Sequence, residues 1–118
     1  MKRRNFIAAA SAAALSASAW AQDAYPSRPV RLIVPFPPGG PTDIMGRTAA
    51  KAMGERLGQQ FVVENKAGAG GNIGTDFVAK AAPDGYTIGL AAISSLAIAP
   101  HLYASLPFNV EKDLLPIS

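Results

Sequence analysis

The chain has 118 residues, of which 49% are hydrophobic and 16% charged, and its formal net charge is +3. This length and composition predict a globular chain of one domain at most and exclude a disordered one. There are no cysteines, which excludes disulfides and thiolate metal sites.

The first 21 residues, MKRRNFIAAASAAALSASAWA, have the three parts of an export signal in the right order. Basic residues occupy positions 2–4, an apolar alanine-rich stretch spans 6–19, and residues 19–21 form an A-x-A cleavage pattern. We therefore expect export and cleavage after Ala21. An amphipathic N-terminal helix of a cytosolic protein is the alternative interpretation.

The charge of the chain depends on this segment. Removing Lys2, Arg3 and Arg4 lowers the count of Lys plus Arg from 11 to 8, which equals the 8 acidic residues. The mature segment, residues 22–118, is then near neutral, and the electrostatic argument for a nucleic-acid partner disappears. Residues 3–7, RRNFI, are similar to a twin-arginine signal; the choice between that route and the Sec route stays open.

The first two elements after the signal are a strand and a helix. VRLIV at 30–34 is rich in β-branched residues and predicts a strand. Apolar or small residues then recur at helical spacing over 44–57, which predicts a helix that ends at Gly58 as C-cap. We expect one face of this helix to pack on the core. That face comprises Met45, Ala49, Met53 and Leu57, flanked by Ile44 and Ala52.

A second strand and a second helix follow. FVVEN at 61–65 predicts the strand, and KAGAGGNIG at 66–74 predicts a glycine-rich loop. TDFVAKAA at 75–82 predicts a short helix, which ends at a turn over 83–85. The residues expected to face the core from this helix are Phe77, Val78 and Ala81.

The third strand and helix complete the pattern. TIGLAAI at 87–93 is apolar almost throughout, as expected for a strand covered on both faces. A helix is expected to begin at Ser94 and Ser95 and to be bent or shortened by Pro100. The resulting order, β-α-β-α-β-α, predicts parallel strands, right-handed connections and a doubly wound α/β layer.

Three polar or glycine-rich segments fall at one edge of this predicted sheet. PFPPGGPTD at 35–43, KAGAGGNIG at 66–74 and Ser94–Ser95 each follow a strand and precede a helix. Ligands of open parallel sheets bind outside the carboxyl ends of the strands, and helix N-termini favour anions. We therefore expect an anion-binding edge here.

The first of these segments is stiffened by its prolines. Gly39 and Gly40 allow a ligand to approach the backbone, and Pro41 suits the first helical position. Thr42 and Asp43 add a hydroxyl and a carboxylate. Capping of the helix and contact with a ligand are equally good interpretations of Asp43.

Nucleotide and catalytic motifs fail when they are tested. Counting from Gly68, the sixth position of a G-x-G-x-x-G fingerprint is Ile73, and no GK[ST] occurs. The glycines of 66–74 also have a simpler explanation, namely close packing of a helix on a strand. His101 is a lone histidine, no G-x-S-x-G elbow is present, and no sequence cluster suggests a metal.

Three stretches carry a resemblance to a known family. They are RPVRLIVPFPPGGPTD, then ERLGQQFVVENKAGAGGNIGTDFVAKAAPDGYTIGL, then APHLYASLPFNVEKDLLPIS. In order and spacing they resemble the substrate-binding proteins of tripartite tricarboxylate transporters, the TctC or Bug family, from about Tyr25 to Ser118. The resemblance implies part of lobe one of a two-lobed periplasmic-binding-protein (Venus-flytrap, type II) fold.

The resemblance also implies a function and a set of site residues. It implies a periplasmic receptor, without enzyme activity or cofactor, that passes small carboxylates or related metabolites to membrane transporter subunits. The implied ligand-binding residues are Phe36, Gly39, Gly40, Thr42, Asp43, Ser94 and Ser95, with Asn72 as a weaker candidate. Pro41 departs from the family pattern by removing one amide donor. Members have roughly 300 residues, so we expect residues 22–118 to stop before lobe two.

Two other functions stay open on sequence grounds. An exported α/β hydrolase-like enzyme would use Ser94 or Ser95 as a nucleophile, although no base partner is evident in the sequence. A secreted partner-binding domain would instead expose large apolar patches. The sequence does not specify the solute, because the resemblance assigns the opposite side of the binding cleft to lobe two.

Overall fold

The computed structural model describes residues 24–117. The expected export signal and its cleavage after Ala21 therefore lie outside the described residues and stay predictions. No helix within 24–117 combines the length and apolar character that crossing a membrane requires.

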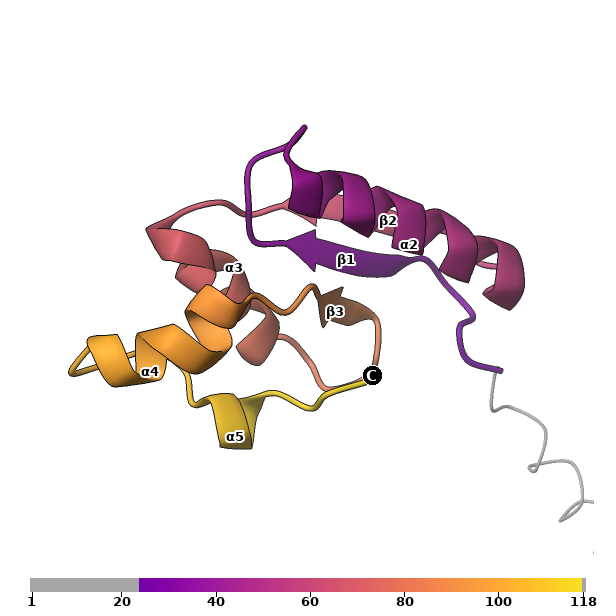
Figure 1. Cartoon of the computed structure of the whole chain (residues 1–118). Coiled ribbons are helices and arrows are strands. Elements are labelled where there is room, and N and C mark those ends of the chain that lie inside the picture. Colours follow the sequence, from indigo (N-terminus) through magenta and orange to yellow (C-terminus); the bar gives the residue numbers. More distant parts are fainter. Residues whose placement is uncertain (1–23, 118) are drawn as a thin grey trace, which may run out of the picture.

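A three-stranded parallel sheet forms the centre of the fold (Figure 1). Its strands are β1 (Val30–Val34), β2 (Phe61–Asn65) and β3 (Thr87–Gly89), in the spatial order β2-β1-β3. The register pairs Val30 with Phe61 and Arg31 with Thr87. The parallel α/β architecture predicted from the alternating elements is confirmed, and β1 lies at the centre because both neighbours pair with it.

Helices cover the two faces of this sheet. On one face, the side chain of Val34 meets α2 (Pro41–Leu57), where a Cβ added to Gly46 would lie 2.8 Å from Cγ2 of Val34. On the other face, Arg31 lies over the ring of Phe77 in α3 (Asn72–Ala79). Alternate strand residues point to opposite faces, so α2 and α3 lie on opposite sides of β1, as Figure 1 shows. Most of the buried core is β1 itself; its members are Val30, Leu32, Ile33 and Val34, with Ala50, Ala99 and Phe108.

The predicted core face of α2 is wrong. Met45 is 67% exposed and Leu57 47% exposed, whereas Asp43, Gly46 and Ala50 are buried. Small side chains at these positions let the helix axis approach the sheet closely, and a row of long side chains would hold it away. Ile44, Met45 and Leu57 consequently lie on the outer surface of the helix, whereas Ala49 and Met53 of the predicted face are half-buried.

Helix boundaries follow the predicted signals in part. Gly58 ends α2 in the left-handed conformation (φ 67°) and donates to the Gly54 carbonyl at 3.0 Å, which confirms the C-cap. A short 3-10 turn, η2 (Ala69–Gly71), leads into α3. That helix therefore starts at Asn72, inside the predicted loop and three residues before the predicted start.

β3 is shorter than predicted, ending at Gly89 rather than at residue 93. Its neighbour β1 ends at Val34, and the last contact is the Leu90 amide donating to the Ile33 carbonyl at 2.9 Å. Beyond that point the chain has no strand partner, which ends the ladder. Ile93, expected in the strand, is 76% exposed.

The last part of the described chain consists of short helical turns. η3 (Ser94–Ile98) is π-helical, α4 (Ala99–Leu102) follows, and α5 (Val110–Asp113) lies nearer the C-terminus. Pro100 occupies the first turn of α4, where its missing amide donor is tolerated, and the α-helical part ends at Leu102. The predicted start of a helix at Ser94 is confirmed, whereas its bending or shortening by Pro100 stays a prediction.

Candidate functional site

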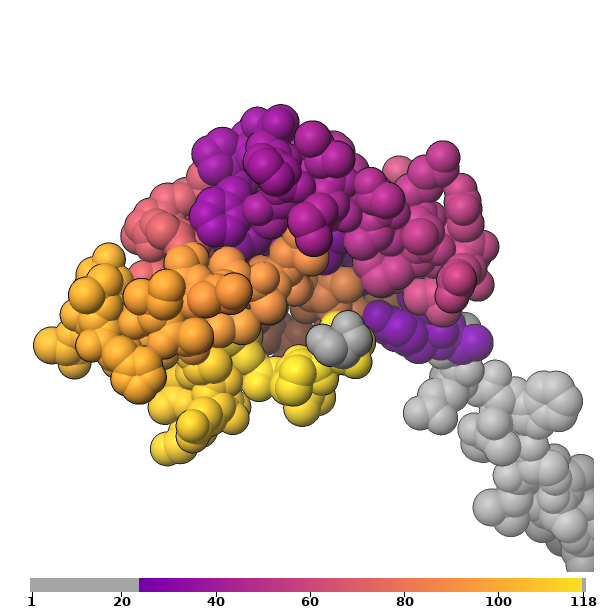
Figure 2. Space-filling model, in the orientation of Figure 1, coloured from indigo at the N-terminus to yellow at the C-terminus, as the bar shows by residue number. Residues whose placement is uncertain are grey.

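Segments that follow the three strands meet at the carboxyl edge of the sheet. A Cβ added to Gly71 would lie 2.8 Å from Oγ of Ser95 and 3.5 Å from Cζ of Phe36, so these three residues are neighbours. Figure 2 shows the start of α2 directly against the orange segment that contains η3. We call residues 36–43 the first wall of this site, and residues 68–72 together with 94–95 its second wall.

The first wall is held by the carboxylate of Asp43, which is 3% exposed. Its Oδ2 accepts from the Gly39 amide at 2.9 Å and from Nε of Arg47 at 2.9 Å. Its Oδ1 accepts from Nδ2 of Asn65 at 2.9 Å, and the same amide group donates to the Phe36 carbonyl at 3.0 Å. One carboxylate and one side-chain amide therefore fix both ends of the loop.

These donors also determine the ionisation of Asp43. Its pKa is lowered from 3.8 to about 2, first by the hydrogen bond from Arg47, then by those from Gly39 and Asn65. Each of these bonds favours the charged form, and together they outweigh the opposing effect of desolvation. The pKa of Arg47 is raised by the same partner.

The second wall is shaped by glycine backbone conformations together with two hydroxyl-to-carbonyl hydrogen bonds, from Ser94 to Gly70 and from Thr75 to Gly71. Gly68, Gly70 and Gly71 have φ values of 132°, 65° and 97°, a region that other residues rarely adopt. Gly74 serves a different purpose, because an added Cβ would lie 2.8 Å from Cα of Pro35 and 2.9 Å from the Lys66 carbonyl. The packing explanation of the glycine-rich loop therefore holds at Gly74.

Two buried polar atoms of the second wall have no hydrogen-bond partner among the described residues. They are Oγ of Ser95, on a residue that is 0% exposed, and Oδ1 of Asn72. Oγ of Ser94 donates to the Gly70 carbonyl at 2.7 Å and so ties η3 to η2. Buried polar atoms are normally paired, so unpartnered ones at one edge provide hydrogen-bonding capacity for a ligand or its waters.

The sequence-predicted site residues divide between the two walls. Those of the first wall are Phe36, Gly39, Gly40, Thr42 and Asp43; those of the second are Asn72, Ser94 and Ser95. Phe36 and Ser95 both lie beside Gly71. Gly39 is exposed, and its amide donates a hydrogen bond to Asp43. Asp43 bonds to the loop amide that precedes its helix, which is close to the capping interpretation.

Sequence reasoning missed Asn65, Arg47 and Gly71. Asn65 is the last residue of β2 and a polar residue at the carboxyl end of a strand, which is a readable signal. Arg47 lies four residues after Asp43, a spacing at which opposite charges meet on a helix. Nothing in the sequence distinguishes Gly71 from the glycines around it.

Neither serine contacts a base in the part of the chain that the structure describes. Ser94 donates to a carbonyl, and the hydroxyl of Ser95 has no partner. His101 is exposed on α4. Over the same residues, 24–117, no group of three or more His, Cys, Asp or Glu side chains is arranged to hold a metal ion.

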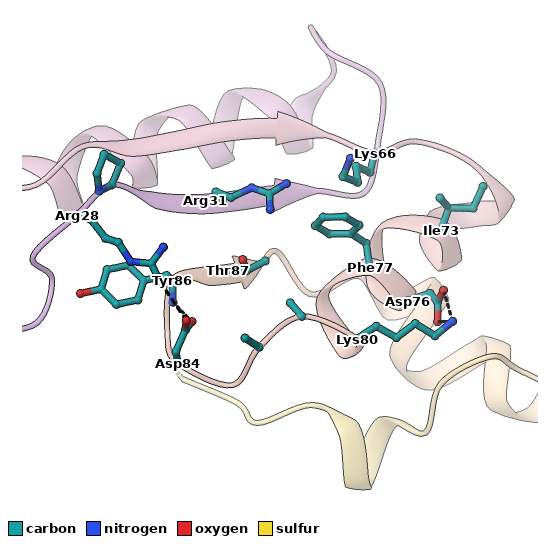
Figure 3. A pocket seen from close by; sticks show the side chains of 13 residues that line it. Arg28, Arg31, Lys66, Ile73, Asp76, Phe77, Lys80, Asp84, Tyr86 and Thr87 are labelled. Carbon is teal, nitrogen blue, oxygen red and sulfur yellow. Dashed lines mark hydrogen bonds and ion pairs between the residues drawn. The ribbon is translucent and has the colours of Figure 1, made fainter.

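A separate open hollow of about 740 Å³ lies on the α3 face of the sheet and contains none of the predicted site residues (Figure 3). Its cations are already paired. Arg28 contacts Asp84 at 3.1 Å, Arg31 contacts Glu64 at 2.7 Å, and Lys80 contacts Asp76 at 2.8 Å. Arg31 and Lys66 also lie over the ring of Phe77. We therefore assign the candidate site to the carboxyl edge, where polar atoms lack partners.

Parallel strands with loops converging at their carboxyl edge are found in many α/β proteins and do not by themselves define a class. Alignment with solved structures places the chain in the class of periplasmic binding proteins, as part of one lobe. One is a periplasmic transporter (TM-score 0.78, 49% identity, 80% of this chain and 32% of that one). Another is MatC of Rhodopseudomonas palustris with bound malate (TM-score 0.71, 39% identity, 75% of this chain and 30% of that one). A third is Rpa4515 of R. palustris with adipate (TM-score 0.70, 37% identity, 74% of this chain and 29% of that one).

The family follows from a direct match of sequence. The model of the tripartite tricarboxylate transporter family receptor, TctC, matches residues 45–118. Protein BugT of Bordetella pertussis is 54% identical over 97 residues, which cover 81% of this chain and 30% of BugT. The chain therefore belongs to the TctC family, as the resemblance predicted, and it spans about a third of the length of the curated relatives that it matches.

Proposed function

We propose that this chain is part of lobe one of a periplasmic receptor that captures small carboxylates for a tripartite tricarboxylate-type transporter. The observation that carries the proposal is the convergence of Phe36, Gly71 and Ser95, with the hydroxyl of Ser95 buried and unpartnered. The malate and adipate bound by two similar structures support a carboxylate as the ligand.

In this proposal the second wall hydrogen-bonds one carboxylate group directly or through water. Ser95 offers a hydroxyl donor, whereas the unpartnered Oδ1 of Asn72 is an acceptor and takes a hydrogen bond from a bridging water. Ser94 fixes η3 against η2, and Phe36 closes the apolar side of the site. Thr42 and the backbone of Gly39 and Gly40 form the opposite border.

The affinity of this wall alone is limited by the number of bonds it can make. A micromolar complex requires about 8 kcal/mol. Three or four hydrogen bonds to a charged carboxylate supply roughly 1.5 kcal/mol each, before the entropy of ordering is subtracted. We therefore expect the chain by itself to bind dicarboxylates with a dissociation constant of about millimolar or weaker.

Titration calorimetry of residues 22–118 with malate and adipate tests the proposal. Weak saturable binding that Ser95→Ala weakens about tenfold supports it, and micromolar affinity contradicts the half-site interpretation. A complete receptor carrying this lobe that binds no member of an organic-acid panel contradicts the receptor function. The enzyme alternative predicts turnover that Ser94→Ala or Ser95→Ala abolishes, and no contact of either serine favours it.

A further inference from the structure

The first wall has few backbone hydrogen-bond donors with which to hold its shape, although its prolines restrict φ. Prolines at 35, 37, 38 and 41 remove backbone donors from the segment, and residues 37–39 are exposed. The Gly39 amide is one of the remaining donors, and it is bonded to Asp43. The geometry of residues 36–40 therefore depends on side-chain acceptors and donors that come from α2 and β2.

Those groups come from two different elements. Asp43 and Arg47 belong to the first two turns of α2, whereas Asn65 ends β2. The Asn65 amide bonds the start of the loop at Phe36 and the carboxylate of Asp43, and this carboxylate bonds the end of the loop at Gly39. Because Phe36 also borders Gly71 and Ser95, the position of its carbonyl affects the width of the site.

We propose that Asp43 and Asn65, supported by Arg47, are positioning residues that hold the first wall in its ligand-receiving shape and do not themselves contact the ligand. This inference rests on the proposed receptor function. Both oxygens of Asp43 already accept bonds from the chain, and the residue is 3% exposed. The network acts on the ligand through the placement of Phe36 and of the loop backbone.

The test compares Asp43→Asn with Asp76→Asn in the 118-residue chain. Asp76 is a matched control, because it is also a helical aspartate paired with a basic residue four positions later, Lys80. Amide spectra report the loop through Gly39, whose proton is shifted downfield by a carboxylate acceptor. Amide exchange of β1 reports the global fold, and titration with sodium malate gives the affinity.

For Asp43→Asn we expect loss of the downfield Gly39 signal and a larger rise of the exchange rate in the loop than in β1, whose protection falls only as far as the global stability does. Malate affinity should fall about tenfold, because a loosened wall loses its preorganisation. Asp76→Asn should leave all three readouts as in the unmodified chain. A merely structural role would raise the exchange rate equally in β1 and in the loop and would leave the malate affinity of the folded chain unchanged.

Two results overturn the inference in distinguishable ways. If the unmodified chain binds malate and Asp43→Asn binds it equally well, the positioning role is wrong and the receptor function stands. If neither the unmodified chain nor a complete receptor carrying this lobe shows a saturable response to malate or to any other acid of the organic-acid panel, the receptor function fails and the inference fails with it.

A second pair of variants keeps the test decisive if Asp43→Asn does not fold. Arg47→Met alters a side chain that is 55% exposed, so the core is undisturbed, and Asn65→Ala removes the two bonds of the amide group. We expect a loss of malate affinity in both, larger for Asn65→Ala. Unchanged affinity in both variants contradicts the proposal.

Discussion

The two walls of the candidate site achieve their shapes by different means. In the first wall, side-chain hydrogen bonds from Asp43 and Asn65 satisfy the loop, and the polar atoms of this network are bonded to the chain. In the second, glycine conformations set the backbone, and Oγ of Ser95 and Oδ1 of Asn72 have no partner among the described residues. The first wall is thus stiff before a ligand arrives, and the second provides the free polar capacity.

The largest expected loss of unfolding free energy comes from a substitution at Gly74, where α3 packs against the backbone of Pro35 and Lys66. Gly74→Ala places a methyl group 2.8 Å from Cα of Pro35 and 2.9 Å from the Lys66 carbonyl, and neither backbone atom can rotate away. We expect the free energy of unfolding to fall by about 1–3 kcal/mol, the usual effect of overpacking. Denaturant unfolding measures it.

Gly70→Asn is the control. A Cβ added at Gly70 meets nothing within 4 Å, and Asn tolerates a positive φ. An equal loss of unfolding free energy in both variants would refute the packing argument.

Ser95→Ala should separate stability from binding. The hydroxyl is buried without a partner, so its removal is expected to raise the free energy of unfolding by about 1 kcal/mol. The same change should weaken malate binding by about tenfold, the value of one hydrogen bond to a charged group. Thermal unfolding and malate titration of one preparation measure both. A loss of stability would mean that the hydroxyl is already bonded within the fold.

In the first wall, Asp43→Asn should lower the free energy of unfolding, in contrast to Ser95→Ala, and the size of this loss should depend on pH. The folded-state pKa of Asp43 is lowered to about 2 from 3.8, so the unfolded chain takes up the proton first as the solution is acidified. The contribution of Asp43 to stability is therefore complete above about pH 4 and is lost as the pH falls toward about 2. We expect Asp43→Asn to be less stable than the unmodified chain at pH 6, with the difference shrinking on acidification. Denaturation midpoints from pH 6 to pH 2 measure it, and a constant difference would contradict the assignment.

The smallest effect is expected from a second ion pair on the same helix. Lys51 and Glu55 have the same spacing as Asp43 and Arg47, but their side chains are 80% and 68% exposed and 4.0 Å apart. Lys51→Ala should change the free energy of unfolding by no more than about 0.5 kcal/mol. Denaturant unfolding of Lys51→Ala and Asp43→Asn under the same conditions compares their losses of unfolding free energy. A similar loss in the two variants would show that burial does not distinguish the two ion pairs.

The location of these segments was predictable because loops after parallel strands share one edge of the sheet. The structure has Phe36 and Ser95 beside Gly71 at this edge, although β3 ends at Gly89, before the predicted end of the strand. Ligand binding by these residues stays a prediction. The roles of individual side chains were not readable. Asn65 bonds residues 29 and 22 positions away, and no local pattern specifies such a partner.

The sequence by itself determined the order of the elements, the parallel sheet and the C-cap at Gly58, because turn residues, β-branched runs and left-handed glycines act locally. Only the tertiary structure decided which face of α2 is buried, where β3 ends and which polar atoms lack a partner. Those outcomes depend on how closely a helix approaches a sheet and on where a neighbouring strand stops. Both are set by residues distant in the chain, so a pattern within one segment cannot specify them.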